Sequence, residues 1–93
     1  MSAATAQVTI THPTGLHARP AVKLTKLAKR FEVPIRLRSI PDGAWIDAKS
    51  IVKVMGLKLR TGSAVELSAE GDGADEAVGA LKGLIERDFD EDV

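Results

Sequence analysis

The sequence predicts an α+β open-faced sandwich, in which a four-stranded antiparallel sheet is covered on one face by three helices. Four short segments alternate apolar and polar residues, which is typical of half-buried strands. Three other segments are amphipathic at helical spacing, and the elements follow in the order β-α-β-β-α-β-α without a repeat or a linker. Ninety-three residues hold one hydrophobic core, so residues 1–93 are expected to form a single domain.

A turn separates the first predicted strand from the first predicted helix. Residues 7–11 alternate, with Val8 and Ile10 on the same side, and the Pro and Gly within residues 12–15 end this strand. From residue 18 to residue 31 the apolar side chains fall within about 120° of helical arc, and the basic side chains lie opposite them. This pattern predicts an amphipathic helix with a cationic outer face.

The middle of the chain predicts a hairpin followed by a short helix. Residues 33–38 alternate again, and the Pro-Asp-Gly sequence that follows them is typical of a turn. We therefore expect a short third strand at residues 44–47. Ser50 can accept a hydrogen bond from an unpaired backbone N–H, which predicts a capped helix that runs to about Met55.

The last third of the chain predicts one strand and one helix. Residues 64–69 alternate and form the fourth strand. The last helix follows Gly73 and has one apolar face, formed by Ala77, Leu81, Leu84 and Ile85. The tail at residues 88–93 is acidic, and we expect it to fray.

Basic and acidic residues are unevenly distributed along the chain. Thirteen Lys and Arg residues balance thirteen Asp and Glu residues, and the neutral total argues against a basic nucleic-acid-binding protein. Residues 1–60 nevertheless carry eleven of the bases and three of the acids, whereas residues 61–93 carry two bases and ten acids. Folding either separates these charges into a basic face that attracts acidic partners or interleaves them on the surface.

Composition excludes several further classes of protein. The chain has no Cys, which removes disulfides, thiolate catalysis and thiolate metal sites. No apolar run approaches the roughly 20 residues of a membrane helix, and residues 1–7 lack the features of a signal peptide. We therefore expect a cytoplasmic domain without membrane insertion, metal or cofactor.

Pro20 fixes where the first helix starts, because proline is tolerated only in the first turn. The capping position then falls at or near His17, although His is a poor cap. A helix N-terminus carries unpaired N–H groups and a partial positive charge, and Arg19 adds donors that suit phosphate oxygens. A phosphoryl group accepted by the His17 imidazole would be stabilised there. On spacing alone, an exposed His17 without chemistry is the simpler interpretation.

The other candidate residues have simpler structural interpretations. His12 is expected to be a surface residue at the end of a strand, and its spacing from His17 does not suit a metal site. Trp45 is expected to pack on its strand and not to bind a ligand. Ser50 is explained as a helix cap, which is worth roughly 1 kcal/mol.

Two motifs resemble signatures of the HPr family, the histidine-containing phosphocarrier proteins of the phosphoenolpyruvate:sugar phosphotransferase system. The first resembles the active-site signature and reads Gly15-Leu16-His17-Ala18-Arg19-Pro20-Ala21. The second follows at the expected distance and reads Ala48-Lys49-Ser50-Ile51-Val52-Lys53-Val54-Met55. Residues 73–77 are similar to the start of the family's last helix, so the resemblance covers about residues 7–88.

The resemblance implies a role for three residues. His17 would accept a phosphoryl group on Nδ1 from enzyme I, which is charged by phosphoenolpyruvate, and would pass it to an enzyme IIA domain for sugar uptake. Arg19 would stabilise that group during transfer. Ser50 occupies the position that an ATP-dependent HPr kinase/phosphorylase modifies in some relatives, with a transcriptional regulator as a further partner. Such a protein is a carrier and not an enzyme.

The short second helix is expected to contribute a docking surface. It has more apolar residues than one stripe can bury, so some should stay exposed. An ordinary buried core is the alternative on sequence alone. The resemblance favours a partner-binding patch of Ile51, Val52 and Met55. The lysines expected around it are Lys49, Lys53 and Lys58.

Three alternatives to a sugar-branch carrier stay open. The first is a regulatory module whose phosphorylation is read by a transcription factor or a kinase. The second is a nitrogen-branch carrier, because residues 45–50 also resemble the nitrogen-branch paralogue NPr. The third is a structural domain in which His17 is inert. We expect a monomer, because a carrier must expose His17 to several partners in turn.

Overall fold

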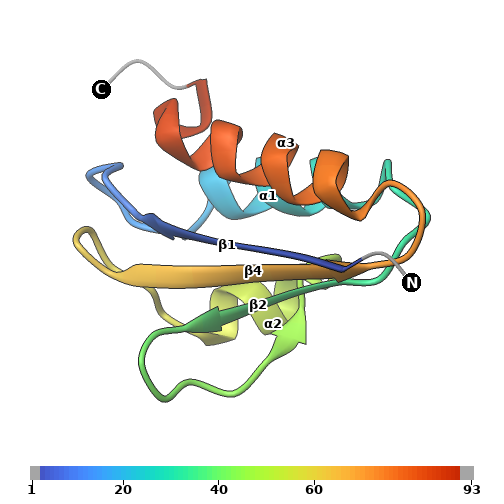
Figure 1. Ribbon diagram of the computed structural model, residues 1–93. Coiled ribbons are helices and arrows are strands. Elements are labelled where there is room, and N and C mark those ends of the chain that lie inside the picture. The colour runs from blue at the N-terminus through green and yellow to red at the C-terminus, as the bar shows by residue number, and fades with distance from the viewer. Residues whose placement is uncertain (1–2, 91–93) are drawn as a thin grey trace.

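The computed structural model describes residues 3–90, which form a four-stranded antiparallel sheet with helices on one face (Figure 1). The strands lie in the order β1-β4-β2-β3, and their bounds are β1 Ala3–Thr9, β2 Ile35–Ser39, β3 Ile46–Asp47 and β4 Ala64–Glu70. The helices are α1 Arg19–Ala28, α2 Ile51–Gly56 and α3 Ala74–Glu86, followed by a short 3₁₀ turn, η1, at Asp88–Asp90. The predicted fold class and element order are confirmed.

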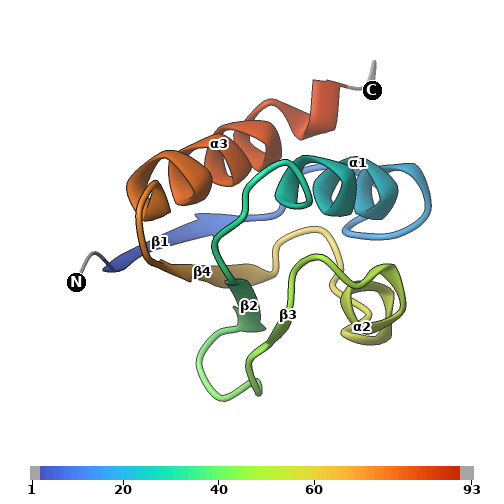
Figure 2. The ribbon, with the colours of Figure 1, turned by 90° about the vertical axis from the view of Figure 1, so that its right-hand side faces the viewer.

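Helices α1 and α3 lie side by side over the sheet, and α2 lies beside α1 at the β3 end (Figure 2). Alternation along the strands places one set of side chains beneath these helices. The buried set comprises Val8, Ile35, Leu37, Val65, Leu67 and Ala69 from the sheet, and Ala21, Leu24, Ala28, Ala77, Leu81 and Ile85 from the helices. Within residues 3–90, no helix combines the length and apolar character that a membrane span needs.

Several predicted bounds were wrong by a few residues. The first strand runs from Ala3 to Thr9 and not over residues 7–11, because every residue of β1 has a partner on β4. The third strand keeps only two residues, since β3 pairs with β2 only at Ile46 and Asp47. Helix α1 ends at Ala28, before residue 31.

The opposite face of the sheet carries polar side chains and the single tryptophan. Arg38 and Glu66 are cross-strand neighbours, and Nη2 of Arg38 lies 2.6 Å from Oε1 of Glu66. The Arg38 guanidinium also lies 4.8 Å from the centre of the Trp45 ring, which is 39% exposed. Trp45 therefore stacks on the sheet through a cation–π contact rather than in the core.

The expectation that the acidic tail frays was wrong for residues 88–90. Phe89 is fully buried, and its ring packs edge-on against His12, with 5.9 Å between the ring centres. All three η1 residues have positive φ. This conformation costs energy, so it persists only where surrounding contacts offset that cost. Lys23 Nζ donates to the Phe89 carbonyl at 2.9 Å, and Thr11 Oγ1 donates to Asp88. Residues 91–93 lie outside the described chain.

An ion pair completes η1 at the surface. Arg87 Nε donates to Asp90 Oδ1 at 2.9 Å, and this hydrogen bond lowers the pKa of the Asp90 carboxyl below its usual value. The pair is exposed, so its contribution to stability is small. Burial of Phe89 is the main interaction that holds the tail on α1 and α3.

We predict that Phe89→Ala lowers the free energy of unfolding by about 3–5 kcal/mol, because it leaves a cavity under the 3₁₀ turn. Val52→Ala is the control, since Val52 is 78% exposed and its truncation should change stability by less than about 0.5 kcal/mol. Urea unfolding measures both. If both substitutions changed the free energy of unfolding by the same small amount, burial of Phe89 would not anchor residues 88–90.

Candidate functional site

The turn that precedes α1 is held by backbone contacts with the segment before β4. The Leu16 N–H donates to the Leu59 carbonyl at 3.0 Å, and the Leu16 side chain is fully buried. Gly15 has φ of 70°, and a Cβ built on it would lie 2.4 Å from the Leu59 carbonyl oxygen. Only glycine fits here, both for its backbone conformation and for this close approach.

His17 follows this anchored turn and is exposed to solvent. The helix cap is Ala18, one residue beyond the predicted position, and among the described residues no side chain caps α1. Ala18 has φ of 52° and ψ of −123°, which is an unusual conformation for a residue with a Cβ. Arg19 is the first helical residue and is exposed, and Pro20 occupies the first turn as expected. The turn therefore projects the imidazole beside an open helix N-terminus.

The electrostatics of this position favour a negatively charged group. The first N–H groups of a helix have no partner within the helix, and the helix dipole places a partial positive charge there. No acidic residue lies in the first turn of α1. Arg19 adds a guanidinium at the same end of the helix. Together these groups suit a phosphoryl group held beside His17.

A hollow of about 500 Å³ opens beside His17. Its walls come from the turn, from the end of α2 and from the segment after it, and they are formed by Thr14, His17, Met55, Gly56, Lys58, Leu59 and Arg60. The structure thus brings Met55 of the predicted docking patch next to His17. Lys58, which was expected to border the docking patch, and Arg60, which was not predicted as a site residue, add positive charge to the same hollow.

The predicted docking patch is only partly exposed. Val52 is 78% exposed, whereas Ile51 and Met55 are half-buried and pack against the core. Lys53 is exposed, but Lys49 Nζ donates to the Phe31 carbonyl at 2.6 Å. Sequence reasoning correctly expected exposed apolar surface on α2, and the structure concentrates that surface at Val52.

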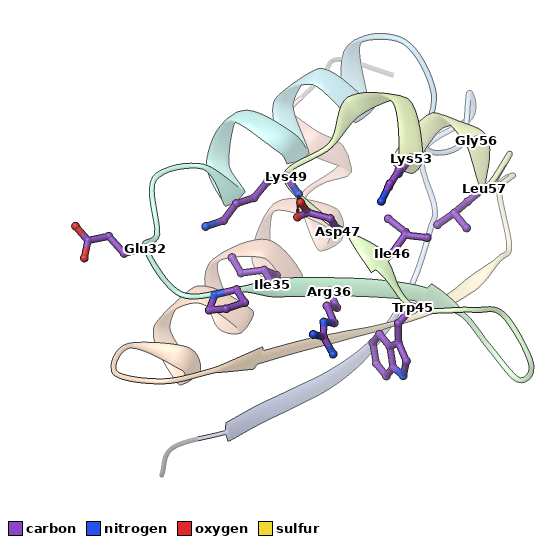
Figure 3. A pocket seen from close by; sticks show the side chains of 11 residues that line it. Glu32, Ile35, Arg36, Trp45, Ile46, Asp47, Lys49, Lys53, Gly56 and Leu57 are labelled. Carbon is purple, nitrogen blue, oxygen red and sulfur yellow. Dashed lines mark hydrogen bonds between the residues drawn. The ribbon is translucent and has the colours of Figure 1, made fainter.

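Lys49 and Lys53 also line a second, larger hollow (Figure 3). It measures about 840 Å³ and lies between α2 and the β2–β3 edge of the sheet, with Trp45 and Arg36 at its border. His17 is not among its lining residues. The two lysines that were expected beside the docking patch therefore also line a hollow that the sequence did not predict.

Ser50 caps α2 as predicted. It has extended backbone geometry, and its Oγ accepts a hydrogen bond from the Lys53 N–H at 3.3 Å. The residue is half-buried. Asp47 supports the same turn, since its Oδ1 accepts from the Lys49 N–H at 2.9 Å.

His12 was wrongly expected at the surface. It is 4% exposed, because the chain turns inward after β1 and Phe89 of the tail packs on the ring. The Thr14 N–H donates to His12 Nδ1 at 3.1 Å. Within residues 3–90, no group of three or more His, Asp or Glu side chains is placed to hold a metal ion.

The fold is a small open-faced α+β sandwich with an exposed histidine directly before the cap of its first helix. The family model described as the PTS HPr component phosphorylation site matches residues 4–87. The chain therefore belongs to the HPr family, the phosphocarriers of the phosphotransferase system, as the sequence motifs indicated.

Individual relatives agree with this assignment. The chain is 40% identical to the phosphocarrier protein HPr of Pseudomonas aeruginosa over 85 residues, which are 91% of this chain and 93% of the relative. It is 36% identical to the phosphocarrier protein NPr of Escherichia coli, again over 85 residues that make up 91% of this chain and 93% of the relative. The structure of HPr from Thermoanaerobacter tengcongensis superposes with a TM-score of 0.89 at 40% identity, covering 97% of this chain and 99% of that one.

We predict that Gly15→Ala lowers the free energy of unfolding by about 2–4 kcal/mol, because positive φ and the Leu59 contact both oppose a Cβ. Gly56→Ala is the matched control. It has open space around its Cβ position and lies in a helix, so stability should stay unchanged or rise by up to about 1 kcal/mol. Thermal or urea unfolding that fails to separate the two variants would contradict the close contact.

Proposed function

We propose that this protein accepts a phosphoryl group on His17 from enzyme I, which takes it from phosphoenolpyruvate, and passes it to enzyme IIA domains in the cytoplasm. The observation that carries the proposal is an exposed histidine directly before the α1 N-terminus, which no side chain of residues 3–90 caps. Membership of the HPr family supports it.

The transfer step exchanges one N–P bond for another. An unprotonated nitrogen of His17, Nδ1 by family resemblance, attacks the phosphorus of the donor's phosphohistidine. The donor N–P bond breaks, its electron pair returns to the donor imidazole, and the new N–P bond forms on His17. The phosphoryl group carries roughly the −1.5 to −2 charge of other protein-bound phosphates. The N–H groups of α1 and the Arg19 guanidinium offset this charge without a metal ion on this chain.

The surface around His17 supports docking of acidic partners. Lys58 and Arg60 line the hollow beside His17, and Lys53 lies on α2 next to the exposed Val52. Such a small apolar spot bordered by cations suits a transient interface, in which charge guides the encounter and little apolar area is buried. Both donor and acceptor must reach the same imidazole, so we infer that the protein acts as a monomer.

A nitrogen-branch carrier is the second candidate function. It is favoured by the match to NPr, which is nearly as strong as the match to the Pseudomonas HPr. The site chemistry is the same in both cases, and only the preferred enzyme I and acceptor differ.

We predict that incubation with phosphoenolpyruvate, Mg²⁺ and enzyme I adds one acid-labile phosphoryl group, which intact-mass spectrometry detects. His17→Ala should gain none. Arg19→Ala should still fold but accept the group at least about tenfold more slowly, since one charge-assisted contact is lost. A phosphoryl group that persists in His17→Ala would refute the assignment. Running the sugar-branch and nitrogen-branch forms of enzyme I in parallel identifies the branch.

We further propose that Ser50 is a regulatory phosphorylation site, a role that its position in the second motif supports. Its hydroxyl lies at the start of α2, two residues before the exposed Val52. A phosphate there would place negative charge on the surface that acidic partners approach and would weaken docking by repulsion. An HPr kinase/phosphorylase and a transcriptional regulator would then be further partners.

We predict that Ser50→Asp weakens binding to enzyme I several-fold at low salt, with the difference shrinking as salt screens the charge. Ser50→Asn is the matched control, because Asn and Asp both cap a helix well and only Asp adds charge. Calorimetric titration at two ionic strengths measures both variants. Equal affinities of the Ser50→Asp and Ser50→Asn variants at low salt would exclude charge-based regulation at this residue.

A further inference from the structure

We propose that His12 is a positioning residue for His17: its buried imidazole holds the turn that presents the phosphoryl acceptor. This inference rests on the proposed carrier function. His12 lies five residues before His17, makes no contact with the phosphoryl site in the proposed reaction and is 4% exposed. It would therefore act through the backbone of residues 13–16.

The imidazole accepts a hydrogen bond inside that turn. The Thr14 N–H donates to His12 Nδ1 at 3.1 Å, and Thr14 Oγ1 lies 2.9 Å from the same nitrogen. The His12 carbonyl accepts from the Gly15 N–H at 2.9 Å and from Thr61 Oγ1 at 2.6 Å. The side chain and the carbonyl of His12 thus bind the backbone of Thr14 and Gly15, and the carbonyl also ties the turn to Thr61, in the segment before β4.

The turn leads directly to the phosphoryl acceptor. After Gly15, the Leu16 N–H is bonded to the Leu59 carbonyl, and His17 is the next residue. Within residues 3–90, the Thr14 N–H donates its side-chain hydrogen bond to the His12 ring. Loss of the Nδ1 acceptor would free this N–H and allow residues 13–15 to shift, which would displace the His17 backbone.

Stability alone does not explain an imidazole at this position. A bond accepted from the Thr14 N–H requires an unprotonated Nδ1, so the ring hydrogen is on Nε2. His12 Nε2 is buried and has no hydrogen-bond partner within residues 3–90. A buried donor without a partner lowers stability, and an apolar side chain would pack against Phe89 without that cost. The property that distinguishes His12 from an apolar residue here is therefore that its Nδ1 accepts a hydrogen bond from the Thr14 N–H.

Two substitutions separate positioning from stability because they change the two properties in opposite directions. His12→Leu keeps apolar packing on Phe89 and removes the unpaired donor, but it lacks an acceptor. His12→Asn loses the ring, but its Oδ1 can accept the N–H two residues on, as in an Asx turn. We expect His12→Leu to be more stable than His12→Asn and about tenfold slower than the unsubstituted protein in accepting the phosphoryl group from enzyme I. His12→Asn should be less stable and close to the unsubstituted rate.

The experiment measures urea unfolding and the single-turnover rate of phosphoryl transfer from phosphorylated enzyme I at saturating enzyme I. Opposite rank orders for stability and rate support positioning. Rates that follow stability, or a His12→Leu rate equal to that of the unsubstituted protein, overturn it. If the unsubstituted protein accepts no phosphoryl group on His17, the carrier function fails first and this inference fails with it.

Nitrogen-15 NMR of the unsubstituted protein gives a second readout that needs no variant to fold. We expect the His12 ring to carry its hydrogen on Nε2, with slow exchange against solvent, and Nδ1 to show the shift of a hydrogen-bonded, unprotonated nitrogen. A ring that carries its hydrogen on Nδ1 at neutral pH overturns the inference, because Nδ1 could not then accept the Thr14 N–H.

Discussion

The close approach of residues 15–16 to the Leu59 backbone is the constraint on which the position of His17 depends. It leaves no space for a side chain at Gly15, and it draws the whole of Leu16 into the core. Because Leu16 points inward and is bonded through its N–H to the Leu59 carbonyl, the next residue is held at the surface. The position of His17 is therefore set by packing at the end of the sheet rather than by contacts of its own.

The chain enters α1 through an unfavourable backbone conformation. Positive φ at Ala18 costs on the order of 1–3 kcal/mol, and no side chain in the described part of the chain offsets this cost by capping the helix. Burial of Ala21 and Leu24 against the sheet holds the helix in place instead. The result is a helix that is packed along one side and, within the described residues, has no side-chain cap at its N-terminus. A capping side chain would compete for the N–H groups that the proposed phosphoryl group would use.

Helix α2 contributes one side chain to the core and exposes another to solvent. Val54 is fully buried and the Ser50 cap fixes the helix start, while Val52 projects into solvent. One hollow lies beside His17 at the end of this helix, and the larger one lies between the helix and the β2–β3 edge (Figure 3). A short helix can be displaced at little cost unless it is anchored at both ends, so the cap and Val54 keep Val52 at a defined place relative to His17.

Local patterns in the sequence determined the class of the fold and the order of its elements, and they predicted the central residues of the proposed site. Alternation and helical spacing are short-range properties, and they identified β1, β2, β4, α1 and α3. Turn and capping residues indicated β3 and α2, and Pro20 located the start of α1 to within one residue. The family motifs identified His17, Arg19 and Ser50. Only the tertiary structure showed that His12 and Phe89 are buried together, that Ala18 has positive φ, and that Lys58 and Arg60 lie beside His17. These features depend on contacts between segments that are far apart along the chain, and no pattern of neighbouring residues records which distant segments will meet.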